Sequence, residues 1–504
     1  MSPLQLFIQG LGNAFNPVAI LYIVAGIIWG IIGGATPGIS ASIAMALALP
    51  FTFGMNPMYS LPMLSAIYVG AEYGGSIPGI LIKTPGTPSA AASAIEGYEL
   101  HKKGLGGKAL HMSLYAGVIG GIISVLILIG TVIPLSQFAL KFGPTQYFWL
   151  SLMGLSMVAA IGGKNPIKGL MAGIFGLFLA TIGTDTFTGC KRYTLGLSVL
   201  SDGLELTGVM VGLFAMAECL KNARDRKIVN NAKLDQKVSM TRPSGKEFKE
   251  CFPVIGLSGI LGTFLGALPG AGTTIASWMA YTQAKLMCKG ADKTFGTGDL
   301  RGVAAPESAN NAVPAGALIP MLALGIPGSN STAIMMAGFT MAGIATGPML
   351  FVNRPDIPYM IMACMFVSQL LLLAVGFVLM RPFIKLTSMN QIYLSCGVLT
   401  LCLLGAYSST NVATSMVLVL IMGVLGLGLI SLGFPAASMV LGFVLGELVE
   451  DNLRRSLQLS RGSINIFFKG PMNIILIVLT VLCLIYPYVL PLLRKKKDAA
   501  KEEK

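Results

Sequence analysis

Long runs of residues without an Asp, Glu, Lys, Arg or His side chain alternate with short polar segments along this chain. Three of these runs cover residues 357–380, 386–446 and 470–493. A transmembrane helix needs about 20 apolar residues, so the middle run alone holds two or three spans. Counting all such runs gives about 11 to 13 spans. The pattern predicts an all-α polytopic membrane protein with about 12 transmembrane helices, because barrel strands would show short alternating segments instead.

Two polar segments divide the chain. Residues 221–250 contain KNARDRK and TRPSGKEFK, and the sequence RKKKDAAKEEK begins at residue 494. Basic segments collect on the cytoplasmic side of inner-membrane proteins, so both are expected in the cytoplasm. The predicted organisation is an N-terminal membrane repeat (1–220), a basic cytoplasmic linker (221–250), a C-terminal membrane repeat (251–493) and a charged cytoplasmic tail (494–504).

The two membrane repeats share two patterns of glycine and proline. The pattern G-x3-G-x2-P-G covers residues 30–38 in the first half and residues 262–270 in the second. The pattern G-x2-I-P-x6-P-G covers residues 74–86 and residues 316–328. Two patterns in the same order, at nearly the same offset, indicate an internal duplication.

Loop charge indicates that the two repeats are inverted. In the first half the loop between the patterns, FTFGMNPMYS, is uncharged, and the segment after the second pattern, ELHKKGLGGK, is basic. In the second half KLMCKGADKTFGTGDLR lies between the patterns, and MAGIATGPMLFVNRPD, with one arginine, follows them. Corresponding loops are therefore expected on opposite sides of the membrane, an arrangement that places a transport site near the midplane between the repeats.

Each Pro-Gly step is expected to interrupt a helix inside the membrane. Proline lacks an N–H and blocks the preceding turn, while glycine allows unusual dihedral angles. Irregular backbone at that depth is tolerated only where it is buried in protein or lines a cavity. A half-helix that starts after the step presents free N–H groups and a partial positive charge, which favours a carboxylate.

The predicted substrate-binding residues lie at these steps, immediately after them, or in the asparagine pair that precedes the last one. They are Pro37, Gly38, Ser40, Lys83, Thr84, Pro85, Gly86, Thr87, Gly270, Gly272, Thr273, Thr274, Asn310, Asn311, Pro327, Gly328, Ser329, Asn330 and Ser331. Two alternatives stay open. The glycines can serve close helix packing, and the Ser, Thr and Asn side chains can simply cap helices.

Few charged residues fall within apolar runs, and such residues are costly there. Lys83 is one candidate partner for a substrate carboxylate, although its side chain could also reach to the membrane interface. Glu72 is a candidate buried acid, and Glu307 is a candidate for the pocket or the coupling ion. The two histidines, His101 and His111, flank a basic loop and are expected to face solvent rather than bind a metal.

Composition narrows the function further. The net charge of +14 is explained by basic cytoplasmic loops, and no nucleic-acid-binding motif accompanies it. The eight cysteines are scattered without a CxxC pair, so neither a metal site nor a disulfide is expected. The chain has no GxxxxGK[ST], HExxH or GxSxG signature. We therefore expect a transporter that uses an ion gradient, with no other cofactor, and not an enzyme.

Several long segments resemble one known family. The segments YGGSIPGILIKTPGTPSAAASAIEGYEL, GALPGAGTTIASWMAY, GVAAPESANNAVPAGALIPMLALGIPGS and LVEDNLRRSLQLS, with TIGTDTFTGCKRYTLG, are similar to the large membrane subunit of the tripartite tricarboxylate transporter family. The resemblance extends from about residue 16 to residue 471. Family motifs fall on the four Pro-Gly steps, Asn310 and Asn311. The chain departs from the family pattern at Lys83, where asparagine is usual.

The resemblance implies a permease subunit in the bacterial inner membrane. It would work with a small four-helix membrane subunit and a periplasmic solute-binding protein. It would import di- or tricarboxylates such as citrate, driven by a Na⁺ or H⁺ gradient. The alternative is a stand-alone ion-coupled symporter or exchanger of organic anions. The sequence leaves open which carboxylate is carried and whether two copies form a homodimer.

Overall fold

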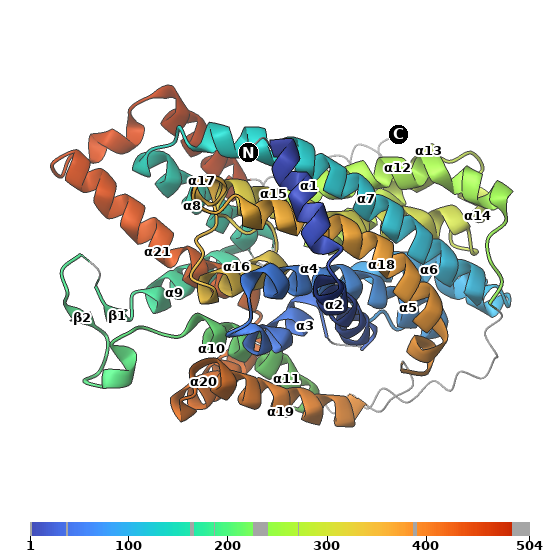
Figure 1. Ribbon diagram of the computed structural model, residues 1–504, viewed down its shortest axis with the longest axis horizontal. Coiled ribbons are helices and arrows are strands. Elements are labelled where there is room, and N and C mark those ends of the chain that lie inside the picture. The colour runs from blue at the N-terminus through green and yellow to red at the C-terminus, as the bar shows by residue number, and fades with distance from the viewer. Residues whose placement is uncertain are drawn as a thin grey trace, which may run out of the picture.

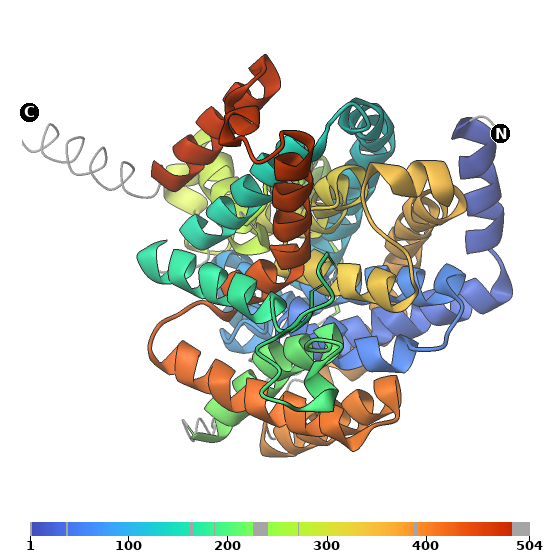
Figure 2. The same cartoon turned by 90° about the vertical axis from the view of Figure 1, so that its left-hand side faces the viewer.

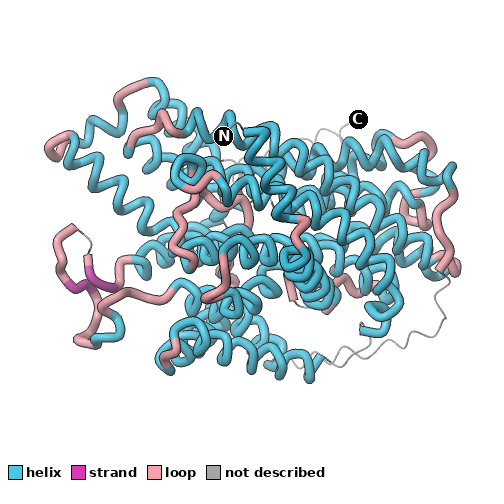
Figure 3. The backbone as a smooth tube through the Cα atoms, in the orientation of Figure 1, coloured by secondary structure: helices cyan, strands magenta, loops and turns pink. Residues whose placement is uncertain are grey.

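The chain is almost entirely helical. The computed structural model describes residues 3–36, 39–161, 166–185, 187–224, 240–270, 272–386 and 391–485. Within these ranges two short strands, β1 (Gly183–Thr184) and β2 (Lys191–Arg192), form an antiparallel hairpin. Figure 3 shows this hairpin at one end of the molecule and helices through the rest. The prediction of a nearly all-α protein is confirmed.

The first repeat is built around a close pair of helices. α2 (Pro17–Ala35) begins at the Asn16 N-cap, with proline in the first turn, and packs along α4 (Pro57–Gly74). The contact is close because α2 presents glycines: a Cβ on Gly34 would lie 2.0 Å from the carbonyl oxygen of Ala71. The shorter elements of this repeat are α3 (Ala41–Ala48), η1 (Leu49–Thr52), α5 (Ser76–Ile82), η2 (Pro88–Ala90) and α6 (Ala91–Lys102).

The second repeat has the same pairing. α12 (Gly245–Ala267) begins with a capping box formed by Ser244 and Glu247, and it packs along α15 (Leu300–Leu324). A Cβ on Gly266 would lie 2.7 Å from the carbonyl oxygen of Val313. The other elements of this repeat are α13 (Gly272–Met287), α14 (Ala291–Thr294), α16 (Asn330–Met341) and α17 (Pro348–Asn353).

Backbone geometry repeats at equivalent helix ends. α2 ends at Thr36, with φ −88° and ψ 114°, and α12 ends at Leu268, with φ −89° and ψ 112°. α5 ends at Lys83, with φ 56° and ψ 21°, and α15 ends at Gly325, with φ 75° and ψ 21°. The shared glycine and proline patterns therefore produce the same local backbone in both halves. Helices stop at all four predicted breaks, although Pro37 and Gly38 themselves lie outside the described residues.

The remaining helices surround this centre. α7 (Gly106–Ala139) and α18 (Asp356–Leu386) come next along the two repeats, and α1 (Pro3–Ala14) lies against α18 on the outside in both Figure 1 and Figure 2. α8 (Pro144–Ile161) and α9 (Pro166–Ala180) pack on α21 (Ala436–Leu459). The other elements are η3 (Ser198–Leu200), α10 (Leu206–Met210), the π-helical segment η4 (Val211–Met216), α11 (Ala217–Arg224), α19 (Gln391–Thr410), α20 (Ala413–Ser431) and η5 (Ile464–Phe468).

The two ends of the molecule are chemically distinct, and Figure 1 shows them at opposite ends of its long axis. At the end that carries α14, the carboxylate of Glu96 on α6 accepts hydrogen bonds from the loop after α14. At the hairpin end, Arg454 binds both Asp185 and Glu450. Hydrogen bonds to Asp185 from Thr188 and from backbone, together with Arg454, hold the pKa of that carboxyl well below its usual range.

Only some of the helices are long spans. Among the described residues, five helices are long and apolar enough to cross a membrane: residues 17–35, 106–139, 245–267, 356–382 and 413–431. The sequence predicted about 12 spans. The breaks explain part of the difference, because they divide the chain into pieces such as the 8-residue α3 and the 12-residue α16, each shorter than a bilayer.

Candidate functional site

Polar side chains from opposite repeats meet between the helix breaks. Ser42, in the first turn of α3, lies 3.1 Å from Ser331, in the first turn of α16, measured between the two hydroxyl oxygens. The Tyr68 hydroxyl on α4 lies 3.0 Å from the Ser329 hydroxyl. The break after α2 and the break after α15 thus contact each other directly, although they are far apart in the chain.

A second set of contacts joins the other two breaks. Thr87, which follows α5, lies 3.0 Å from the hydroxyl of Ser89, and the Ser89 hydroxyl donates to the Glu72 carboxylate at 3.1 Å. Thr273, which follows α12, lies near the same carboxylate. The Asn310 amide donates to the Glu72 carbonyl oxygen at 3.0 Å. We call Ser42, Tyr68, Glu72, Thr87, Ser89, Thr273, Asn310, Ser329 and Ser331 the polar hub.

The glycines at the breaks allow the backbone segments to approach closely. A Cβ on Gly86 would lie 2.0 Å from the carbonyl oxygen of Gly34, and a Cβ on Gly328 would lie 2.8 Å from that of Gly266. The Gly270 N–H donates to the Gly328 carbonyl oxygen at 3.2 Å. Close packing, the first alternative for these glycines, therefore accounts for Gly86 and Gly328, and it is this packing that brings the polar hub together.

Two of the predicted hydroxyl groups cap helices. Ser40 accepts from the Ile43 N–H at 3.3 Å as the N-cap of α3. Ser329 forms a reciprocal capping box with Thr332 at the start of α16. Capping satisfies N–H groups that the first turn leaves free. The Ser329 hydroxyl therefore makes two kinds of contact, since it caps α16 and also lies beside the Tyr68 hydroxyl.

Lys83 lies outside the polar hub. It is exposed, and its ammonium group lies 5.6 Å from the centre of the Tyr98 ring on α6. Its positive φ is a backbone conformation that favours glycine or asparagine. Gly325 has the same conformation at the equivalent helix end, so the constraint at this position is conformational in both halves. A contact between Lys83 and substrate stays a prediction.

Other predicted residues vary in their exposure. Asn311 is buried on a different face of α15 from Asn310: it faces α7, where a Cβ on Gly117 would lie 2.7 Å from the Asn311 amide nitrogen. Asn330 is exposed. The remaining members, all buried or partly buried, are Thr84, Pro85, Gly270, Gly272, Thr274 and Pro327.

The structure adds residues that the sequence did not single out. Tyr68 and Ser89 belong to the polar hub through contacts across the fold. The repeated pattern could have indicated Tyr68, because Tyr68 precedes Gly74 by the same interval that separates Asn310 from Gly316. The prediction that His111 faces solvent is wrong. Its side chain is buried, with Nδ1 2.7 Å from the Gly107 carbonyl oxygen, because α7 continues through the polar stretch into the protein.

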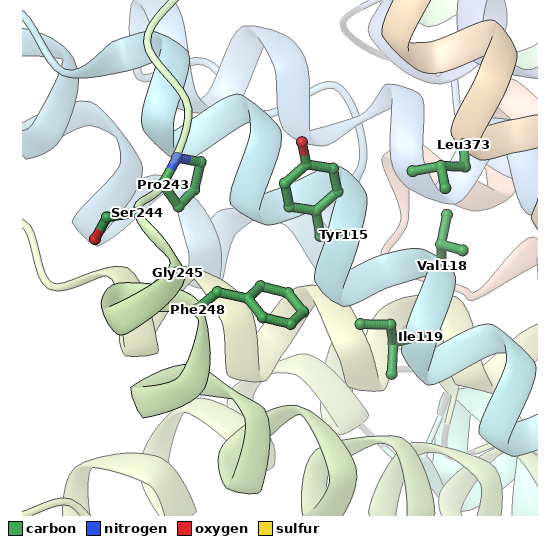
Figure 4. A pocket seen from close by; sticks show the side chains of 8 residues that line it. All are labelled: Tyr115, Val118, Ile119, Pro243, Ser244, Gly245, Phe248 and Leu373. Carbon is green, nitrogen blue, oxygen red and sulfur yellow. The ribbon is translucent and has the colours of Figure 1, made fainter.

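One cavity lies away from the polar hub. It has a volume of about 440 Å³ and lies where the start of α12 meets α7 and α18. Figure 4 shows the side chains of Tyr115, Val118, Ile119, Phe248 and Leu373 around it. This lining is mostly apolar and carries no charge, so the cavity does not fit a carboxylate. Among the described residues, no group of three His, Cys, Asp or Glu side chains could hold a metal ion.

Comparison with known proteins gives a consistent picture. The model of the tripartite tricarboxylate transporter TctA family matches residues 20–441. An uncharacterized 52.8 kDa protein in the TAR-I ttuC' 3' region of Agrobacterium vitis is 35% identical over 494 residues, which cover 97% of each chain. An uncharacterized protein in the TAR-II ttuC' 3' region of the same organism is 35% identical over 237 residues, 47% of this chain and 97% of that one. No solved structure matches the chain.

Proposed function

Because the chain belongs to the tripartite tricarboxylate transporter TctA family, we propose that it is the permease subunit of a carboxylate importer. In this proposal it imports di- or tricarboxylates across the bacterial inner membrane, driven by Na⁺ or H⁺. It receives them from a periplasmic solute-binding protein and works with a small four-helix membrane subunit. Family membership supports a multi-pass transport protein with partner subunits, and the substrate and the driving ion are our inference.

The polar hub is the observation that carries this proposal. Hydroxyl and amide groups from all four breaks gather there, at the point where the two repeats meet. α3 and α16 begin at the hub, and free N–H groups with a partial positive charge at helix starts favour anions. Sites between repeated units, formed by interrupted helices, are a general feature of secondary transporters.

Two contacts support an inverted relation between the repeats. α6 and α16 occupy equivalent places in the two repeats. The last turn of α6 lies at the α14 end, where Lys103 donates to the Thr297 carbonyl oxygen at 2.6 Å. The last residue of α16, Met341, instead contacts Thr207, which follows the hairpin segment. Equivalent helices therefore end near opposite ends of the molecule. The basic loops that follow α6 and α13 lie together, which suits a shared cytoplasmic side.

The test is uptake by reconstituted vesicles. We expect organic di- or tricarboxylates to accumulate when the chain is reconstituted with its partner subunits, with Na⁺ and pH varied independently. Uptake by the chain alone at the same rate would instead indicate a stand-alone symporter. Absence of uptake for every acid in the panel, with all subunits correctly assembled, would contradict the proposal.

A matched pair of variants connects the activity to the polar hub. Tyr68→Phe removes only the hydroxyl that lies beside Ser329, whereas Tyr147→Phe removes a hydroxyl that is not part of the hub and donates to the Ala139 carbonyl oxygen. We expect the first change to raise the KM for the carboxylate by about tenfold, equivalent to about 1.4 kcal/mol. The second should leave uptake unchanged. Equal effects of the two changes would show that the hub is not the substrate-binding site.

A further inference from the structure

A second polar site, separate from the polar hub, surrounds the buried carboxylate of Glu307 on α15, between α5 and α7. Ser76 of α5 donates to one carboxylate oxygen at 2.6 Å, and Ser113 of α7 donates to the other at 2.9 Å. The side chain is 1% exposed. Within the described part of the chain it has no Lys, Arg or His partner. A buried carboxylate without a compensating cation is strongly unfavourable, so the site calls for one positive charge.

Two buried amides extend this site along α7. Asn311 lies one helical turn above Glu307 on α15, and it faces Gly117, one turn above Ser113 on α7. A further turn along α7, a Cβ on Gly121 would lie 2.3 Å from the amide carbon of Gln369 on α18. Positions four residues apart are separated by about 6 Å along a helix.

Neither amide has a hydrogen-bond partner among the described residues. Asn311 is 1% exposed and Gln369 is 0% exposed, and in this part of the chain nothing pairs with the oxygen or the nitrogen of either amide. Each such buried group costs about 1 to 3 kcal/mol unless something satisfies it. Glycines at positions 117 and 121 leave the space for these amides, since any side chain there would displace them. The sequence pattern thus preserves room for two polar groups that the protein itself does not satisfy.

The atoms that could bind a cation at this site are the oxygen atoms of the carboxylate, hydroxyl and amide groups. Carboxylate, hydroxyl and amide oxygens suit hard cations. A single carboxylate neutralises one charge, which selects a monovalent ion over Mg²⁺ or Ca²⁺. We propose that Glu307 and Asn311, with the hydroxyl groups of Ser76 and Ser113, bind Na⁺, and that Gln369 is the next oxygen ligand along the route to it.

This inference rests on the proposed function, and it identifies where the coupling ion binds. Asn310 and Asn311 are consecutive on α15 but face different partners. Asn310 contacts Glu72 in the polar hub, while Asn311 faces α7. Because both asparagines are carried by α15, Na⁺ bound at Asn311 would help to hold α15 in the position that brings Asn310 to the hub, which links the two binding events.

Na⁺ alone is the probe for the first experiment. The purified complex is heated in NaCl or in N-methylglucamine chloride at equal ionic strength, without any carboxylate, and the Kd for Na⁺ is obtained from the shift in unfolding temperature. We expect Glu307→Gln and Asn311→Leu to weaken Na⁺ binding by about tenfold or more, as loss of a metal-binding group does. Gly130→Ala, on the same helix α7 where an added Cβ meets no atom within 4 Å, should keep the wild-type Kd.

A second readout separates ion binding from a structural role. Asn311→Leu and Gln369→Leu remove amides that have no partner, so without Na⁺ both variants should unfold at the wild-type temperature or above it. Lower unfolding temperatures without Na⁺, or an unchanged Kd for Na⁺ in both Glu307→Gln and Asn311→Leu, would overturn the proposal. So would carboxylate uptake by the wild-type complex that is independent of Na⁺, although the proposed function would then stand. Na⁺ binding lost in the variants, with no carboxylate transported by the wild-type complex, would support the ion site and refute the proposed function.

Discussion

The carboxylate of Glu96 should hold the two repeats together at the α14 end of the molecule. It is fully buried on α6. One oxygen accepts from the Tyr281 hydroxyl at 2.8 Å and from the Gly296 N–H. The other accepts from the N–H groups of Gly298 and Asp299 at 2.8 and 2.9 Å. Gly296 and Gly298 both have positive φ, which turns their N–H groups towards the carboxylate.

The perturbation is Glu96→Gln, which preserves size and removes the charge. Glutamine would direct its oxygen to Gly298 and Asp299, and its amide nitrogen to the Tyr281 hydroxyl, which can turn to accept. The Gly296 N–H then loses its acceptor, at a cost of about 1 to 3 kcal/mol. The two remaining N–H bonds change from charge-assisted to neutral, at about 0.5 to 1 kcal/mol each. The expected loss of stability is therefore about 3 kcal/mol.

The assay is thermal unfolding of the purified protein. Unfolding is monitored by the reaction of a fluorogenic maleimide with cysteines that are buried in the fold, among them Cys251, Cys364 and Cys402. Glu99→Gln is the matched control. It lies on the same helix, but it is partly exposed, and among the described residues its carboxylate pairs only with Lys102, so its removal should cost less than about 1 kcal/mol. If Glu96→Gln unfolds at the same temperature as Glu99→Gln, the reasoning about this carboxylate is wrong.

Three further results are expected from the structure. Gly86→Ala should destabilise the protein by about 2 kcal/mol or more, because its Cβ would meet a backbone carbonyl oxygen of α2 at 2.0 Å; Gly12→Ala, which meets no atom within 4 Å, should be neutral in the same unfolding assay. Lys83→Asn should keep the left-handed helix end while removing the charge, and should raise the KM for carboxylate uptake by about threefold or more; an unchanged KM at normal expression would show that Lys83 does not contact the substrate. Cysteines introduced in residues 54–60 should react from the periplasm and those in 285–301 from the cytoplasm; labelling of both from one side would refute the inverted topology.

The positions of the helix breaks could be predicted because their cause is local. A proline followed by a glycine favours the end of a helix, by removing an N–H and relaxing the backbone, although Pro78 and Gly79 lie within α5. α5 and α15 accordingly end just before their Pro-Gly steps. The residue after each helix, Lys83 or Gly325, has the same left-handed conformation. The repeat of these patterns also indicated the duplication, which the matching dihedral angles of Thr36 and Leu268 reflect.

Burial of individual side chains was harder to predict. His111 was expected in solvent because its neighbours in the sequence are basic, but α7 carries it into the protein against Phe377. Asn310 and Asn311 were treated as one pair, yet adjacent residues on a helix point about 100° apart, so they contact different helices. Such differences depend on which neighbour packs against each face, and the local pattern does not specify the neighbour.

The sequence by itself determined that this chain is a helical membrane protein and that helices stop near four glycine and proline patterns, two in each half, since these properties follow from hydrophobicity and backbone chemistry over a few residues. The tertiary structure decided which breaks meet. Tyr68 and Ser329 are 261 residues apart in the chain, and Ser42 and Ser331 are 289 apart, yet both pairs are in contact. The reason is that these contacts arise from packing of glycine-lined helices across the fold, in which the fit of distant surfaces, rather than any local preference, selects the partner.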